Sequence, residues 1–236
     1  EGVATGVQVG DAVMAMVVPK AAHGGYREQI ALDARAVVPA PAGTTHIEAC
    51  TLPMNGLTAR QSLDLLELTR GQVLAVTGGA GAYGGYVIAL AKAEGLTVIA
   101  DAADSDRVLL EELGADVMVS RGPDLAARIR AHFPDGVDGF ADGALLNELA
   151  LPAVKDGGRL TSVRGFEGNG ERGVKVLPTW VRRYDAEYEK LDRLRKQCET
   201  GVLRLRVADV VTPERAAEAH HRLEAGGTRG RIVIAF

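Results

Sequence analysis

The spacing of apolar residues changes at Gly71. Before it, short apolar runs are interrupted by glycine and proline, which predicts two antiparallel strands at Ala12–Val18 and Tyr26–Leu32. Helical spacing follows around Ile47–Leu52 and Thr58–Leu66. Because a few short strands leave edges and apolar faces exposed, we do not expect this first part to close a core by itself.

After Gly71, apolar strands alternate with amphipathic helices. The strands are predicted at Val73–Thr77, Thr97–Asp101, Asp116–Val119, Val137–Ala141 and Leu160–Val163. The helices between them are predicted at Tyr83–Glu94, Asp106–Leu113, Asp124–His132 and Leu145–Val154. This alternation is typical of parallel βαβ units with helices on both faces of the sheet.

The end of the chain departs from this alternation. Thr212-Pro213 begins a helix that ends at Ala225, and the strand Arg231–Ala235 follows. We expect that strand to return to the β-rich first part. The predicted fold is therefore α/β, with a doubly wound Rossmann domain at residues 51–206 and a discontinuous β domain at residues 1–50 and 207–236. The chain begins at Glu1, inside a β-rich pattern, so we expect an N-terminal segment to be missing.

Composition and charge narrow the class of protein. The 236 residues are 47% hydrophobic and 25% charged, as in ordinary globular proteins. A net charge of −4 favours neither nucleic acid nor an anionic membrane as a partner. Two cysteines, Cys50 and Cys198, form no CxxC pair, and no apolar run is long enough to cross a bilayer. We therefore expect a cytoplasmic protein.

A glycine-rich loop is the strongest chemical signal. Gly79, Gly81 and Gly84 satisfy G-x-G-x-x-G between a predicted strand and a predicted helix. In this motif the first glycine permits a tight turn, the second lets a diphosphate approach the backbone, and the third lets the helix pack on the strand. We therefore predict a dinucleotide site that includes Gly78, Gly79, Ala80, Gly81, Ala82, Tyr83 and Gly84. A phosphate loop of the Walker type is disfavoured because no Gly-Lys-Ser/Thr follows.

Asp101 ends the next strand, 22 residues after Gly79. A carboxylate at this place commonly accepts hydrogen bonds from the adenosine ribose and repels a 2′-phosphate, which favours NAD(H). The opposite preference stays open, because Arg107 and Arg121 are near enough in sequence to bind a 2′-phosphate. A second interpretation is that Asp101 has no role in binding and only begins a solvated loop.

Two further segments follow the carboxyl ends of predicted strands. Asp142-Gly143 follows the fourth strand of the sheet, and Gly165-Phe166 follows the fifth. Open α/β sheets bind ligands at this edge, so we include all four residues in the predicted cofactor site.

The order of these motifs resembles the medium-chain dehydrogenase/reductase superfamily, and within it the zinc-free quinone oxidoreductases. The resemblance runs over nearly the whole chain. It is carried by Leu52–Ala59, Gly71–Leu74, Thr77–Gly84, Gly10–Val13, Gly25–Glu28, Leu113–Asp116, Gly136–Asp138 and Gly157–Arg159.

The resemblance implies a GroES-like β-barrel catalytic domain, here N-terminally incomplete, beside the Rossmann domain, with the active site in the cleft between them. It also implies a homodimer that uses NAD(P)H to reduce a quinone, an enone or a related α,β-unsaturated carbonyl compound. Zinc-dependent relatives have a cysteine ligand four residues before the threonine that matches Thr58, and Met54 stands there in this chain. Since methionine is a poor zinc ligand, we predict no metal.

The same resemblance places Thr58 near the nicotinamide and Asn55 in the same cleft. The residues alone also allow a helix start for Thr58 and a helix cap for Asn55. Two other functions stay open: an enoyl reductase that acts on thioester-bound enones, and a non-catalytic nucleotide-binding protein whose substrate cleft has decayed.

Overall fold

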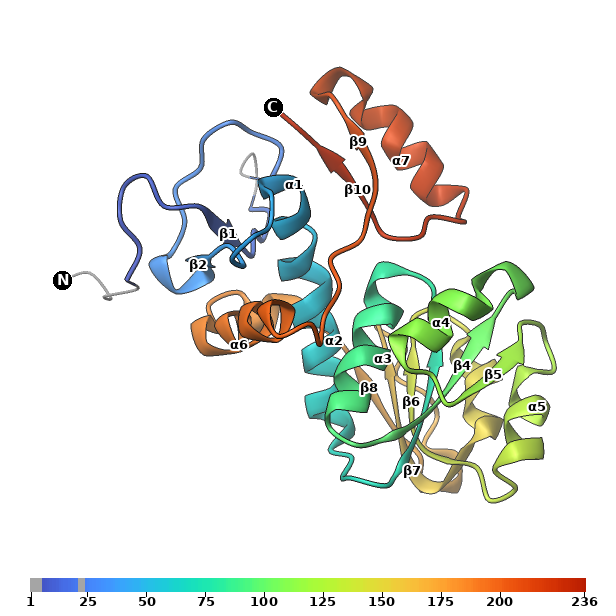
Figure 1. Ribbon diagram of the computed structural model, residues 1–236. Coiled ribbons are helices and arrows are strands. Elements are labelled where there is room, and N and C mark those ends of the chain that lie inside the picture. Colours follow the sequence, from blue (N-terminus) through green and yellow to red (C-terminus); the bar gives the residue numbers. More distant parts are fainter. Residues whose placement is uncertain (1–5, 21–23) are drawn as a thin grey trace. The chain divides into compact units, whose positions relative to one another are not determined.

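The computed structural model describes residues 6–20 and 24–236, and its chain divides into two compact units (Figure 1). The discontinuous unit comprises Glu1–Leu57 and Val181–Phe236, and the sheet unit comprises Thr58–Trp180. The discontinuous unit is larger than the predicted β domain, because it also includes residues 51–57 and 181–206. In the described part of the chain, every helix is too short or too polar to span a membrane.

A six-stranded parallel sheet forms the centre of the sheet unit. Its order is β5 (Val117–Ser120), β4 (Thr97–Ala102), β3 (Val73–Thr77), β6 (Val137–Asp142), β7 (Val154–Ser162) and β8 (Lys175–Pro178). The chain thus runs outward from β3 in one direction and then outward from β6 in the other. The carboxyl ends of β3 and β6 form the switch point at which such sheets bind ligands.

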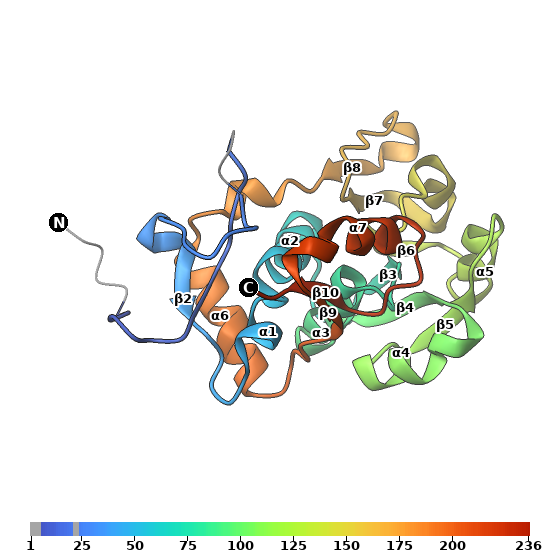
Figure 2. The ribbon, with the colours of Figure 1, turned by 90° about the horizontal axis from the view of Figure 1, so that it is seen from above.

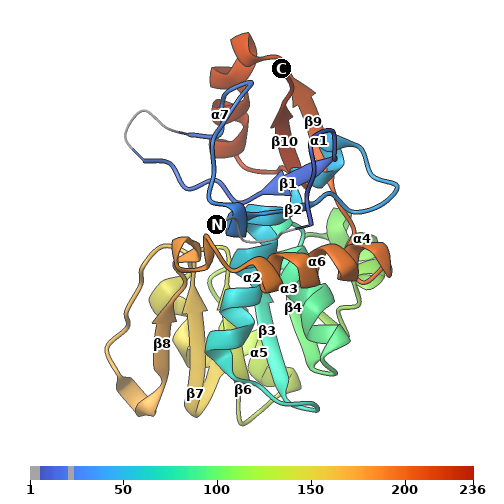
Figure 3. The same cartoon turned by 90° about the vertical axis from the view of Figure 1, so that its left-hand side faces the viewer.

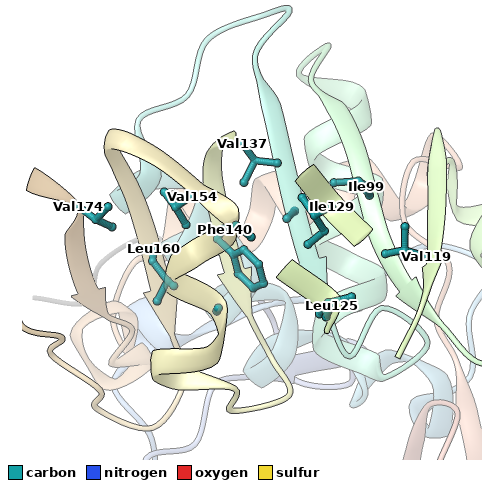
Figure 4. Close-up of a cluster of buried hydrophobic side chains, with 12 residues drawn as sticks. Ile99, Val119, Leu125, Ile129, Val137, Phe140, Val154, Leu160 and Val174 are labelled. Atoms are coloured by element: carbon teal, nitrogen blue, oxygen red, sulfur yellow. The ribbon is translucent and has the colours of Figure 1, made fainter. Parts of the chain in front are cut away.

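Helices cover both faces of this sheet (Figure 3). On one face, α3 (Ala82–Ala93) contacts β3 and β4, and α4 (Arg107–Leu113) contacts β4. On the other face, α5 (Leu125–His132) packs against β5 and against the 3₁₀ helix η3 (Asn147–Ala153). Figure 4 shows the core of this second face, where Phe140 lies among branched aliphatic side chains from the strands and from α5.

Most of the predicted elements of the sheet unit are confirmed. All five predicted strands form, although β7 begins at Val154 rather than Leu160. The sixth strand, β8, was not predicted. The predicted helix Leu145–Val154 is wrong in type: it forms η3, because Pro152 inside it lacks an N–H and disfavours an α-helix.

Two separate small sheets belong to the discontinuous unit. β1 (Val13–Ala15) pairs antiparallel with β2 (Val37–Pro39), and β9 (Val207–Val211) pairs parallel with β10 (Arg231–Ile234). The helix α6 (Tyr188–Glu199) packs against β2, and α7 (Ala216–Glu224) lies beside the β9–β10 pair (Figure 2). The described residues of this unit form no closed barrel. The predicted strand at the end of the chain is confirmed as β10, which belongs to the same unit as residues 1–57.

In the first part of the chain, one predicted strand is absent and one predicted helix is longer than predicted. Tyr26–Leu32 forms no strand and is largely exposed, because β1 takes β2 as its partner instead. The predicted helix Thr58–Leu66 begins earlier, at Leu52, as α2 (Leu52–Leu66), since Pro53 is well tolerated in a first helical turn. The remaining helices are α1 (His46–Ala49) and the 3₁₀ helices η1 (Ala34–Ala36), η2 (Asp104–Asp106), η4 (Glu171–Gly173), η5 (Val181–Tyr184) and η6 (Pro213–Arg215).

Candidate functional site

The glycine-rich loop connects β3 to α3 through one left-handed residue and one helix cap. Gly78 has a φ of +67°, a conformation in which glycine is favoured. Gly81 is extended and caps α3, and its N–H donates to the Gly78 carbonyl oxygen at 2.9 Å. The tight turn predicted for Gly79 is therefore made by Gly78.

Two of the motif glycines are required by close packing. A Cβ on Gly84 would lie 2.3 Å from the Gly78 carbonyl oxygen, so α3 packs directly on the turn, as predicted. A Cβ on Gly79 would lie 3.0 Å from Leu110 Cδ2 and 3.1 Å from Ile88 Cδ1. Gly79 is thus a packing residue that lets the helices α3 and α4 approach the strand end.

The N-terminus of α3 is open to an anion. Of the described residues, a Cβ added at Gly81 would meet only the Gly78 carbonyl oxygen, at 3.1 Å. The first helical turn contains no acidic residue, and a glycine contributes no side-chain cap. The first N–H groups of a helix have no intrahelical acceptor and carry a partial positive charge. The loop has the geometry that binds a diphosphate.

Asp101 lies beside this loop, but its carboxylate already has two partners. It accepts a hydrogen bond from the Gly79 N–H at 3.2 Å and forms an ion pair with Arg121 Nε at 3.2 Å. Arg121 also pairs with Asp106 at 3.1 Å. Asp101 is only 5% exposed, and Asp106 is buried as well. The Arg121 guanidinium is therefore shared by two buried carboxylates near the end of β4.

Arg107 is separate from this group. Its Nε lies 3.4 Å from Asp104, whose side chain is 96% exposed. Of the two arginines predicted near the adenosine end, Arg121 is the one that the structure brings to Asp101.

A second buried carboxylate holds the loop after β6. Asp142 is fully buried and accepts hydrogen bonds from Thr77 Oγ1 at 2.7 Å and from the Asn147 N–H at 2.8 Å. Thr77 Oγ1 in turn accepts hydrogen bonds from the N–H groups of Gly143 and Ala144. The loops after β3 and β6 are therefore fixed to each other at the switch point.

This β6 loop stores backbone strain. Leu145 and Asn147 both have positive φ values, +60° and +54°, although neither is glycine. Such conformations cost free energy and cluster at functional sites. Here the strain lies directly after the strand end that faces the glycine-rich loop.

Four hydroxyl groups meet behind the glycine-rich loop. The Tyr83 hydroxyl lies 2.8 Å from Ser62 Oγ, which lies 3.0 Å from Thr179 Oγ1, and Thr161 adjoins the same tyrosine. Burial raises the pKa of Tyr83 to about 12, against the smaller lowering effects of Ser62 and Thr161. We refer to Ser62, Tyr83, Thr161 and Thr179 as the hydroxyl cluster.

The ends of β7 and β8 lie next to this cluster. Gly165 has a φ of +79°, and a Cβ there would lie 3.0 Å from the Trp180 ring. Phe166 packs against the core of the sheet, and Trp180 is 37% exposed. Phe166 thus points toward the core, and Trp180, next to Thr179 in the chain, is partly exposed.

The two predicted catalytic residues lie on α2. Asn55 and Thr58 are three residues apart, so they occupy one face of that helix. Asn55 Nδ2 is buried and has no hydrogen-bond partner among the described residues. The described residues contain no group of three or more His, Cys, Asp or Glu side chains that could hold a metal ion.

Sequence reasoning missed Ser62, Thr77 and Thr179. These residues carry hydroxyl groups on α2, at the end of β3 and directly after β8; Thr77 begins the glycine-rich segment, but its side chain was given no role there. The one signal in the sequence was a polar residue among apolar ones, which indicates a buried hydrogen bond. The residues that accept or donate those hydrogen bonds are distant in sequence and are identified only in the structure.

Comparison with known proteins agrees with the sheet and the loop. A family model described as zinc-binding dehydrogenase matches residues 113–234, which is more than half of the chain. Among solved structures, an NAD-dependent alcohol dehydrogenase is 29% identical with a TM-score of 0.80, covering 91% of this chain and 66% of the other. An alcohol dehydrogenase superfamily protein from Novosphingobium aromaticivorans is 25% identical with a TM-score of 0.86, covering 98% and 76%.

Curated relatives are similar over most of this chain. A 2-methylene-furan-3-one reductase of Solanum lycopersicum is 28% identical over 97% of it, and an NADPH-dependent alkenal/one oxidoreductase of Arabidopsis thaliana is 27% identical over 95%. The chain spans 58% of the length of each. A zinc-type alcohol dehydrogenase-like protein of Staphylococcus epidermidis is 25% identical over 90% of this chain, which spans 71% of it. The chain belongs to the zinc-binding dehydrogenase family of the medium-chain dehydrogenase/reductase superfamily, as its sequence motifs predicted.

Proposed function

We propose that this chain binds NAD(P)H and transfers its hydride to an enone or a related α,β-unsaturated carbonyl compound, with quinones as further acceptors. The observation that carries the proposal is the glycine-rich loop at the switch point. Gly84 excludes any side chain, and Gly81 leaves the positive end of α3 accessible. This combination fits a dinucleotide diphosphate.

The residues around the loop divide between the two halves of a dinucleotide. The diphosphate would lie on Gly81–Gly84, with the adenosine ribose toward Asp101 and Arg121. The nicotinamide half would then extend toward Gly143 and Gly165, because these residues follow strands on the other side of β3. The bound cofactor supplies the hydride, and the protein orients the ring and excludes water.

The names of two relatives support an enone as substrate. One is a 2-methylene-furan-3-one reductase and the other an alkenal/one oxidoreductase that uses NADPH. Both are matched over nearly the whole of this chain. The proposal also includes the homodimer that the family resemblance implies.

The reaction is proposed to proceed without zinc. Met54 occupies the position of a zinc-ligand cysteine in the family pattern, and methionine is a poor zinc ligand. The residues present therefore do not fit that metal. The raised pKa of Tyr83 makes its hydroxyl a weaker acid than that of an ordinary tyrosine. We propose that the proton that follows the hydride comes from water.

Oxidation of NADH and NADPH by the purified chain tests the proposal. The decrease in absorbance of the reduced cofactor is followed with a panel of enones, quinones and one thioester-bound enone. We expect turnover with enones. Cofactor binding without turnover of any acceptor would favour the non-catalytic nucleotide-binding protein, and the absence of cofactor binding would refute the dinucleotide site itself.

A further inference from the structure

Tyr83 is placed between the two loops of the switch point. Tyr83 lies in the first turn of α3, and its ring packs against Gly143 in the loop after β6. A Cβ on Gly143 would be 2.8 Å from Tyr83 Cδ1 and 2.9 Å from Cε1. The ring therefore occupies the space that a side chain at residue 143 would fill, so this ring position requires glycine at residue 143.

The hydroxyl of Tyr83 fixes this ring from its far end. Ser62 Oγ lies 2.8 Å from the hydroxyl, and the fully buried Ser62 also contacts Thr179 Oγ1 at 3.0 Å. These partners come from α2 and from the end of β8, so one tyrosine joins the glycine-rich loop to two other elements. Thr161 Oγ1 is also buried at the cluster and has no well-formed hydrogen bond among the described residues.

The position of Tyr83 relative to a dinucleotide follows from the order of the strands. Asp101 lies at the end of β4 on one side of β3, whereas Gly143 follows β6 and Thr161 lies in β7 on the other side. A dinucleotide whose diphosphate lies at the glycine-rich loop spans both sides. With the adenosine near Asp101, the Tyr83 ring lies on the nicotinamide side.

We infer that Tyr83 is a positioning residue for the nicotinamide ring, held in place by hydrogen bonding within the hydroxyl cluster. The inference rests on the proposed function and deepens it. The tyrosine ring is rigid and packed on Gly143, and its hydroxyl prevents the ring from rotating away from the cluster. It acts through geometry, because its ring packs on Gly143 and its hydroxyl is held by Ser62.

The test compares Tyr83→Phe with Tyr86→Phe. Tyr83→Phe keeps the ring and removes only the hydroxyl. Tyr86 is a buried tyrosine on the same helix but outside the hydroxyl cluster, which makes it the matched control. Calorimetry measures the affinity of each variant for NADPH and NADH, and for ADP-ribose and its 2′-phosphate, which lack the nicotinamide.

We expect Tyr83→Phe to weaken binding of the complete cofactors by about tenfold, comparable to the net contribution of one hydrogen bond, ~1.4 kcal/mol. Binding of the fragments should stay the same, because the adenosine side of the site is untouched. Tyr86→Phe should leave the ratio of the two affinities unchanged. The primary isotope effect with 4-deuterated cofactor should change in Tyr83→Phe alone, which a general loss of stability would not produce.

Two results separate the possible failures. If the wild type binds NADPH and NADH but Tyr83→Phe leaves the ratio of cofactor to fragment affinity unchanged, the inference is wrong and the proposed function stands. If the wild type binds neither the cofactors nor the fragments, both are wrong.

Discussion

Replacing Asp101 with serine removes a buried negative charge from the adenosine side of the site. In the structure this carboxylate is bound by the Gly79 N–H and by Arg121, which it shares with Asp106. Two carboxylates and one guanidinium give this group a net negative charge. We predict that Asp101→Ser strengthens binding of NADPH relative to NADH, because the 2′-phosphate then meets an Arg121 that pairs with Asp106 alone.

The size of the effect follows from the charges. Two unit charges ~4 Å apart near a protein surface interact by about 4 kcal/mol before screening, and solvent and salt reduce this considerably. A tenfold change in the ratio of dissociation constants corresponds to ~1.4 kcal/mol, and we expect a change of about that size. Loss of the hydrogen bond from Gly79 affects both cofactors and therefore cancels in the ratio.

The test is to measure the dissociation constants of NADPH and NADH by calorimetry, and to compare their ratio between the wild type and Asp101→Ser. Asp101→Asn keeps an acceptor for the Gly79 N–H and removes only the charge, so it should shift the ratio in the same direction. Asp104→Asn is the control, because Asp104 is a solvated acid that pairs with Arg107. A wild type that already prefers NADPH, or an unchanged ratio in both Asp101 variants, would show that this carboxylate does not act on the ribose end.

Three further predictions concern the loop, the metal and the sheet. Gly81→Val should abolish NADH and NADPH binding in calorimetry while the Tm stays near that of the wild type; Gly84→Ala should lower the Tm as well, because its Cβ would meet backbone at 2.3 Å. Unchanged affinity in Gly81→Val would contradict the dinucleotide site. Elemental analysis of the purified chain should find no stoichiometric zinc, and chelators should leave activity unchanged; one zinc per chain would disprove this. Asp138→Asn should destabilise the fold by about 1.5–3 kcal/mol at pH 7 in urea unfolding, because it removes a charged acceptor. Burial raises the pKa of Asp138, but hydrogen bonds from Lys155, the Val73 N–H and Gln72 lower it further. The stabilisation is thus present above the ordinary pKa of 3.8 and lost as the pH falls below it, so the two proteins should converge in acid.

The sequence predicted those parts of the fold that depend on local spacing. β3 was predicted residue for residue, because an apolar run of β-branched character between turn signals leaves few alternatives. Gly95 and Gly114 follow the ends of α3 and α4 with φ values of +81° and +98°, a conformation that favours glycine at helix ends. The 3₁₀ helix η3 was mistaken for an α-helix because its apolar spacing is helical and only Pro152 distinguishes the two.

Features that depend on a distant partner were not predictable in this way. Tyr26–Leu32 alternates like a strand, but a strand needs a neighbour, and β1 takes β2. β8 is a short edge strand that follows a glycine-rich stretch, so its sequence alone gives little signal. Register and pairing are decided by tertiary contacts that one sequence does not display.

The candidate site shows the same division between local and distant information. Gly84 follows from a motif because its constraint comes from Gly78, six residues away. Asp101 was recognised as the end of a strand, but its two partners decide whether the carboxylate acts on a ribose as a hydrogen-bond acceptor or as a charge. Each carboxylate oxygen has one protein partner and can accept a further hydrogen bond, so Asp101 can act on the ribose as an acceptor and on a 2′-phosphate through its charge. We therefore predict that Asp101, Arg121 and Asp106 together set the preference for NADH or NADPH, so that a prediction from Asp101 alone is incomplete.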